Sequence, residues 1–137
     1  MKNIIYVTFL FLSILSGCEE ADNCCIIPVT DELSGTWLFY EYGYSPGFGY
    51  ETKAVTPIPP QTLTFNAGKV SSNLEGFEDI VRYAILTDAV TRTPYVALYK
   101  SDKDTDPSTY TFELSDNVMK LYFRYCYEGC HMAFKKL

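Results

Sequence analysis

The stretch from position 33 to position 44 reads Leu-Ser-Gly-Thr-Trp-Leu-Phe-Tyr-Glu-Tyr-Gly-Tyr. It is the first and longest strand-like run in a chain of 137 residues. Aromatic and β-branched side chains suit the pleated, half-buried surface of a β-strand. The whole chain carries 12 tyrosines and 9 phenylalanines and is poor in strong helix formers. Residues 33–44 are therefore predicted to open an all-β domain.

Further strand-like runs follow, separated by turn residues. Asn66-Ala67-Gly68 predicts a three-residue hairpin loop with Gly in the third place, and Asp116-Asn117 joins two later runs. Eight short runs with short spacers are typical of an antiparallel sandwich or barrel. The seven runs after the first are 62–65, 69–74, 81–87, 94–101, 109–115, 118–125 and 130–136.

Two segments need separate interpretation. Residues 45–61 hold four prolines and are predicted to form one long loop, a length typical of functional lids or disorder. Phe77, Ile80 and Ile85 belong to an apolar set at helical spacing, so residues 75–86 are open to a helical interpretation. We favour a turn or short helix over 75–80 followed by a strand.

The first 17 residues have the layout of a secretory signal peptide. Lys2 supplies a basic head, residues 4–15 form an apolar middle, and Ser16-Gly17 precede Cys18. A membrane-spanning helix needs roughly 20 apolar residues, and this run has about 12. We expect residues 1–17 to direct export and then to be removed.

Leu15-Ser16-Gly17-Cys18 resembles the lipobox of bacterial lipoproteins. The resemblance implies diacylglycerol on the Cys18 thiol, cleavage before Cys18, palmitate-type acylation and a membrane partner reached through this lipid. It places the protein at the outer membrane, facing either the periplasm or the surface. Residues 18–32 form an acidic tether, which resembles a Bacteroidota-type surface-export signal but equally fits a solvated linker. The folded domain is expected over 33–137.

Charge and cysteine content narrow the functional classes. The formal net charge is −6 and no Lys/Arg cluster is present, which argues against nucleic acid and against docking on anionic lipid. In an exported chain, cysteines other than the lipidated one indicate disulfides. Cys126 and Cys130 flank a three-residue hairpin loop with Gly129 in the third place, so we expect them to be bonded. Cys24 and Cys25 bridge each other, cross-link chains or stay free.

Gly35-Thr36-Trp37 at the head of the first strand resembles the lipocalin signature. The whole layout is similar to small lipocalin-like lipoproteins, through Ser45-Pro46-Gly47, Leu63-Thr64-Phe65, the Cys126–Cys130 hairpin and the closing Phe134-Lys135-Lys136. The resemblance implies an antiparallel eight-stranded barrel with Trp37 inward near its floor. Since side chains alternate along a strand, Phe39 and Glu41 are then expected on the same inner side. These three residues are the ligand-binding candidates.

Other candidate chemistry is weak. Glu41 facing the interior would need Arg82 or Arg124 as a partner, either as a structural ion pair or beside a ligand. Asp102 to Asp106 have the spacing of an EF-hand loop, but Pro107 stands where that loop requires Gly, so a solvated loop is favoured over calcium. The expected register places His131 opposite Tyr125 without a nearby carboxylate.

The expected function is binding rather than catalysis. The sequence contains no nucleophile–base motif and no phosphate loop, so no enzyme, metal or cofactor is predicted. In the first hypothesis, the barrel holds a small apolar ligand between Trp37 and the loop 45–61. In the second, the barrel is solid and is a protein-interaction or structural module of the cell envelope, with Tyr40, Tyr42 and Tyr44 facing outward. Both faces of the last hairpin are partly apolar, so its inward face stays open.

Overall fold

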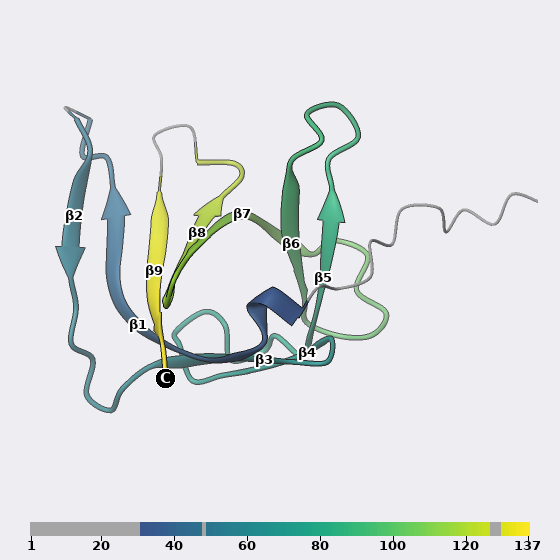
Figure 1. The fold of residues 1–137 in the computed structure, drawn as a ribbon, viewed down its shortest axis with the longest axis horizontal. Coiled ribbons are helices and arrows are strands. Elements are labelled where there is room, and N and C mark those ends of the chain that lie inside the picture. The colour runs from purple at the N-terminus through teal and green to yellow at the C-terminus, as the bar shows by residue number, and fades with distance from the viewer. Residues whose placement is uncertain (1–30, 48, 127–129) are drawn as a thin grey trace, which may run out of the picture.

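The computed structural model describes residues 31–47, 49–126 and 130–137, which form a closed, antiparallel, eight-stranded β-barrel with one extra strand (Figure 1). The predicted fold class is confirmed. One 3₁₀ turn, η1 (Asp31–Leu33), precedes the strands. In these three described ranges, no helix is long and apolar enough to cross a membrane. The strands are β1 (Gly35–Tyr44), β2 (Glu51–Ala54), β3 (Thr62–Asn66), β4 (Lys69–Ser72), β5 (Arg82–Thr87), β6 (Pro94–Tyr99), β7 (Ser108–Ser115), β8 (Val118–Phe123) and β9 (His131–Lys136).

The barrel closes because β1 pairs with strands on both of its edges. Each strand from β3 to β8 pairs with the next one in sequence order, and β9 returns to pair with β1. The first half of β1 pairs with β3, and its second half pairs with β2. β2 is thus an additional strand that is not part of the closed barrel. It pairs with the end of β1 that extends beyond β3 (Figure 1). Closure pairs the backbone of edge strands that would otherwise be exposed.

β2 was not predicted, since residues 45–61 were expected to form one loop. The strand has only four residues, Glu-Thr-Lys-Ala, and all four side chains are exposed. With no buried face, the strand has no apolar alternation for a sequence reading to detect. Its formation depends on the free edge that β1 offers from Glu41 to Tyr44.

The weakest seam lies between β4 and β5, which share the single register pair Lys69–Arg82. The connection between these strands contributes three buried side chains, Leu74, Phe77 and Ile80. The Phe77 N–H donates to the Leu74 carbonyl (2.9 Å), and the Ile80 N–H donates to the Phe77 carbonyl (3.1 Å). Two successive turns, each closed by an i→i+3 hydrogen bond, therefore produce the apolar spacing that resembled a helix. The favoured interpretation, a turn and then a strand, is correct.

The closed end of the barrel is filled by large side chains. Trp37 is 1% exposed, and its indole Nε1–H donates to the Leu33 carbonyl at 2.8 Å. This bond ties η1 to the floor of the barrel. The largest side chains that are as fully buried as Trp37 are Phe65, Phe134, Leu33, Leu63, Leu98, Met119, Leu121 and Val96. The predicted inward position of Trp37 near the floor is therefore observed.

A β-bulge at Tyr40 changes the facing of the second half of β1. Phe39 lies opposite Phe134, but the next register pair is Glu41–Ala133, so Tyr40 is the extra residue. An extra residue reverses the alternation of side chains along a strand. Glu41 consequently points outward and Tyr42 points inward, which corrects the expectation that Glu41 shares a face with Trp37 and Phe39.

The register of the last hairpin also differs from the prediction. Phe123 and Cys130 join across the hairpin through the Phe123 N–H and the Cys130 carbonyl (3.3 Å), and His131 lies opposite Tyr122 rather than Tyr125. Leu121 then shares the inward face with Met132, which settles the orientation of the last hairpin left open above.

The hairpin between β3 and β4 is tighter than predicted. Ala67 and Gly68 form a two-residue turn with φ of 48° and 81°, as in a type I′ turn.

Candidate functional site

The end of the barrel opposite Trp37 is open and aromatic. The β1–β2, β5–β6 and β8–β9 connections all lie at this end (Figure 1). A pocket of about 340 Å3, which we call the mouth pocket, is lined there by residues of β1, β7, β8 and β9 and by Phe77. Its lining is mostly aromatic and aliphatic, from Tyr42, Gly43, Phe77, Tyr110, Leu121, Phe123, Cys130, His131 and Met132. Among these described residues there is no Asp, Glu, Lys or Arg.

The aromatic rings of the mouth pocket form a connected wall. The ring centroids of Phe77 and Tyr110 are 5.8 Å apart, and those of Tyr110 and Phe123 are 5.6 Å apart. Tilted pairs at such distances are favourable beyond their buried area. Burial raises the pKa of the Tyr110 hydroxyl, which keeps that group neutral. The pocket wall therefore suits an uncharged, apolar molecule.

His131 lies beside this pocket in a hydrogen-bond network that the sequence did not reveal. Its side chain is 2% exposed, and its Nε2 lies 3.2 Å from Glu41 Oε1. An ionised carboxylate can only accept, so Nε2–H donates to Glu41 and Nδ1 is left to accept the Tyr50 hydroxyl proton. The expectation that His131 has no nearby carboxylate is wrong. The bulge at Tyr40 and the shifted hairpin register bring Glu41 and His131 together.

The network continues on the outer face of the barrel. The Tyr122 ring packs at 5.6 Å from the His131 ring, and the Tyr122 hydroxyl donates to Glu113 Oε2 at 2.9 Å. Burial and the Glu113 carboxylate raise the pKa of Tyr122 to about 12. Burial and the Glu41 charge also raise the pKa of Tyr50. Both imidazole nitrogens are occupied within the protein, so the arrangement ties β1, β9 and the β1–β2 connection together.

Gly43 makes this network sterically feasible. Gly43 pairs with His131 across β1 and β9, and its φ is not in the left-handed region. A Cβ atom at this position would overlap the Tyr50 hydroxyl and the His131 ring. The glycine is thus required by a close approach of side chains rather than by backbone conformation. No local sequence signal identifies this requirement.

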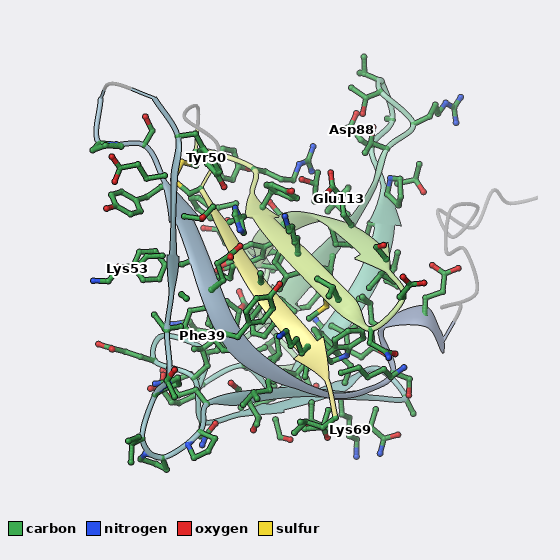
Figure 2. The ribbon with its side chains drawn as sticks, turned by 60° about the vertical axis from the view of Figure 1, so that its left-hand side comes forward. Phe39, Tyr50, Lys53, Lys69, Asp88 and Glu113 are labelled. Atoms are coloured by element: carbon green, nitrogen blue, oxygen red, sulfur yellow. A yellow bond between two sulfur atoms is a disulfide. The ribbon has the colours of Figure 1, made fainter. Side chains whose placement is uncertain are left out.

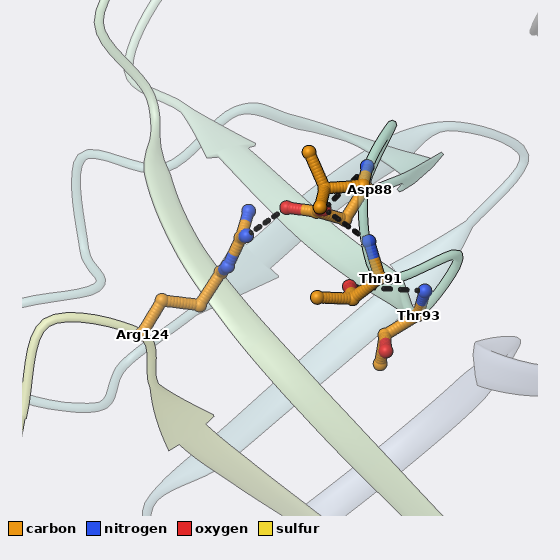
Figure 3. A network of polar contacts seen from close by, with 5 residues as sticks. Asp88, Thr91, Thr93 and Arg124 are labelled. Atoms are coloured by element: carbon orange, nitrogen blue, oxygen red, sulfur yellow. Dashed lines mark hydrogen bonds and ion pairs between the residues drawn. The ribbon is translucent and has the colours of Figure 1, made fainter.

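A second polar network braces the rim (Figure 3). Asp88 accepts the backbone N–H groups of Val90 (3.0 Å) and Thr91 (2.9 Å), and its Oδ2 lies 2.6 Å from Arg124 Nη2. These bonds lower the pKa of Asp88 to about 2, with the backbone N–H groups as the largest cause. The Arg124 guanidinium also lies 4.2 Å from the centroid of the Tyr95 ring. The pair links the β5–β6 connection to the segment after β8.

This pairing corrects the partners expected for Glu41. Arg124 binds Asp88, and Arg82 Nε lies 3.8 Å from Asp102 Oδ1. Neither arginine therefore pairs with Glu41, whose side-chain partner is the His131 imidazole.

The Asp88–Arg124 link predicts a defined acid response. Because the folded-state pKa lies below the ordinary 3.8, the carboxylate stabilises the fold above about pH 4. That contribution is lost as the pH falls from about 4 to about 2. We expect urea unfolding between pH 5 and pH 2 to show a shallower loss of stability in Asp88→Asn than in the parent. The exposed Asp106→Asn is the control and should match the parent; equal slopes for Asp88→Asn and the parent would contradict the assignment.

The sulfur atoms of Cys126 and Cys130 are at bonding distance, with Cα atoms 5.8 Å apart, in agreement with the expected pair. Their setting is different, because β8 ends at Phe123 and Cys126 lies in the connection, where its N–H donates to the Phe123 carbonyl (3.0 Å). Gly129, Cys18, Cys24 and Cys25 lie outside the described residues, as do the predicted signal peptide and most of the tether.

The loop with EF-hand-like spacing is closed by its own backbone. Asp104 accepts the N–H groups of Lys100 (2.9 Å) and Asp106 (3.0 Å), and these bonds lower its pKa. In the described part of the chain, no group of three or more His, Cys, Asp or Glu side chains could hold a metal ion. The loop thus uses Asp104 as a turn-forming residue.

The three predicted ligand-binding residues are dispersed. Trp37 belongs to the packed floor, Glu41 points outward to His131, and Phe39 borders a second pocket beneath residues 55–60. The mouth pocket instead uses residues that the sequence analysis did not select. Of the tyrosines considered as an outward set, Tyr42 lines the mouth pocket, while Tyr44 is exposed.

The fold and the mouth pocket define the class of protein, a closed eight-stranded β-barrel with one filled end and one apolar, open end. Comparisons with protein-family models, with curated proteins and with solved structures found no match. The lipocalin-like resemblance accordingly stays a prediction.

Proposed function

We propose that this protein is an exported, lipid-anchored barrel that binds a small apolar ligand in the mouth pocket and does not act as an enzyme. The observation that carries the proposal is the composition of the pocket: about 340 Å3 lined by aromatic and aliphatic side chains. Small-molecule sites typically span about 300–1,000 Å3, with apolar walls and a few polar groups. Here the polar groups are the Tyr42 and Tyr110 hydroxyls.

The architecture supports binding at one end. The floor around Trp37 is packed, and the mouth pocket lies beyond this floor, where Leu121 and Met132 line it. A filled floor and an open mouth are typical of small barrels that hold one ligand. An apolar ligand gains roughly 25 cal/mol for each Å2 of apolar surface that it buries there.

The proposed anchor is diacylglycerol on Cys18, which makes the membrane a partner of the protein. Residues 18–32 would connect this lipid to η1, and η1 lies at the closed end of the barrel (Figure 1). In this arrangement the tether joins the domain at the end opposite the mouth pocket. The pocket is then free to receive a ligand from the periplasm or the medium. An outer-membrane location is part of the proposal.

The test is mass spectrometry of the full-length protein isolated from the membrane fraction and then offered a lipid extract. Denatured samples should carry a diacylglyceryl group on Cys18, and native samples should retain a small apolar adduct. Met132→Trp fills the pocket, and Phe123→Ser removes part of its wall in case the larger side chain disturbs folding. Both should lose the adduct, while Val90→Trp on the exposed β5–β6 connection should keep it. An adduct that persists in both pocket variants would contradict the site.

A second function is favoured by a separate observation. Four aromatic side chains at the same end are exposed, and exposed apolar patches often mark partner surfaces. They are Tyr44 (36%), Tyr50 (47%), Phe123 (41%) and Tyr125 (71%). If native spectra show no adduct, capture of an envelope protein that is lost in Tyr125→Ser supports this alternative.

A further inference from the structure

A short strap, residues 55–61, crosses the outside of the barrel between β2 and β3. It is fastened to β1 at both ends. The Val55 N–H donates to the Tyr40 carbonyl (2.8 Å), and the Phe39 N–H donates to the Gln61 carbonyl (3.0 Å). Between these bonds, Pro57, Pro59 and Pro60 have no N–H to donate. The middle of the strap therefore cannot pair with β1.

A pocket of about 230 Å3 lies between the strap and β1. Its walls are apolar, from Leu38 on β1 and from Val55, Pro57 and Pro60 on the strap, with Tyr40 at the bulge. Phe39, labelled beside β1 in Figure 2, borders the pocket while its ring packs against Phe134 of the core. The strap pocket shares no lining residue with the mouth pocket, so it is a separate site.

One charged group borders the strap pocket. Lys135 on β9 pairs with Leu38 on β1, and its Nζ lies 4.7 Å from the centroid of the Tyr40 ring. Among the described residues, no carboxylate lies within 4.0 Å of this ammonium. This is notable in a chain with a net charge of −6. The cation is therefore available to an anion from outside the domain.

We propose that the strap pocket binds a small amphipathic carboxylate, with its apolar part under the strap and its carboxylate on Lys135. The chemistry is complementary, because the walls offer dispersion contacts and the rim offers one charge-assisted hydrogen-bond donor. The volume is below that of typical drug-sized sites, so the apolar part is one ring or a short chain rather than a whole lipid. The strap is rich in proline and is hydrogen-bonded to β1 at both ends, so the pocket is preformed. A preformed pocket lowers the entropic cost of binding.

The experiment is a titration of the full-length, ¹⁵N-labelled protein with octanoate, followed by amide chemical shifts. We expect the Leu38, Tyr40 and Val55 amides to move together in the millimolar range, and octylamine to move them much less. Lys135→Gln should weaken octanoate binding by about tenfold, as expected for loss of one charge-assisted hydrogen bond. Lys136→Gln, the neighbouring lysine above Trp37, is the matched control and should bind as the parent does.

Two outcomes would overturn the proposal: strap amides that do not respond to octanoate, or equal binding of octanoate and octylamine. Because Lys135→Gln changes an exposed side chain, failure to fold is not expected; Val55→Phe, which fills the pocket, provides an independent variant. The amides of Tyr42, Leu121 and Met132 report on the mouth pocket in the same spectra. The strap proposal and the proposed function can therefore fail separately.

Discussion

Trp37→Ala is expected to lower the free energy of unfolding by about 3–5 kcal/mol, the usual cost of emptying a large buried aromatic site. The side chain is 1% exposed and packs into the floor of the barrel. Its removal also leaves the Leu33 carbonyl without the indole donor that holds η1. Urea unfolding followed by far-ultraviolet circular dichroism measures the effect, because Trp37 is the chain's single tryptophan and its fluorescence is lost with it.

Trp37→Phe separates the two contributions. It retains most of the buried volume but not the hydrogen-bond donor, so we expect a smaller loss of about 1–3 kcal/mol. Leu137→Ala, which removes an exposed apolar side chain, should stay within about 0.5 kcal/mol of the parent. If Trp37→Ala lowered the free energy of unfolding no more than Leu137→Ala, the stabilising roles assigned to the packed floor and to the Trp37–Leu33 hydrogen bond would be contradicted.

Gly43→Ala is expected to lower the free energy of unfolding by about 2–4 kcal/mol, because a Cβ cannot coexist with the present positions of Tyr50 and His131. The tyrosine must leave, and the buried imidazole then loses the partner of its Nδ1. Strand propensity alone predicts the opposite sign, since alanine is normally preferred to glycine in a strand interior. Thermal unfolding therefore distinguishes the two explanations by the sign of the change.

A double-mutant cycle tests the same contact. Tyr50→Ala removes the hydroxyl, so part of the cost of Gly43→Ala should disappear in that background. The remainder should persist, because the His131 ring still occupies the space of the new methyl group. If the losses in the free energy of unfolding were fully additive in the double mutant, a side chain at position 43 would not contact Tyr50. Gly47→Ala, in the β1–β2 connection, meets no neighbour within 4 Å of its Cβ, and because the φ of Gly47 is +98° it reports the effect of backbone conformation alone.

Local patterns predicted most of the fold. The eight strand-like runs match β1 and β3 to β9, with boundaries shifted by a few residues at most. Most of these strands bury at least one side chain in the core, and β7 packs Tyr110, Phe112 and Leu114 against it, so their sequences alternate or carry continuous apolar runs. β2 escaped prediction because all four of its side chains are exposed.

The candidate sites were much harder to predict. The inward set was extended from Trp37 to Glu41 by regular alternation, and the bulge at Tyr40 reverses that alternation between Phe39 and Glu41. A bulge has no required residue type here, and Tyr40 is as suited to a regular strand as its neighbours are. The mouth pocket combines residues from five separate segments, and the strap pocket depends on two hydrogen bonds between distant parts of the chain.

The sequence by itself determined the all-β class, the strand order along the chain and the Cys126–Cys130 pair. Each of these depends on residue type and short spacing, which act locally. The inward position of Trp37 was implied by the lipocalin-like resemblance. Only the tertiary structure decided which residues meet across the barrel. It paired His131 with Glu41 and Tyr50, turned Tyr42 inward and placed the Lys135 ammonium over the Tyr40 ring. Register and bulges are set by the combined packing of all the strands, and one residue of shift exchanges the inner and outer faces.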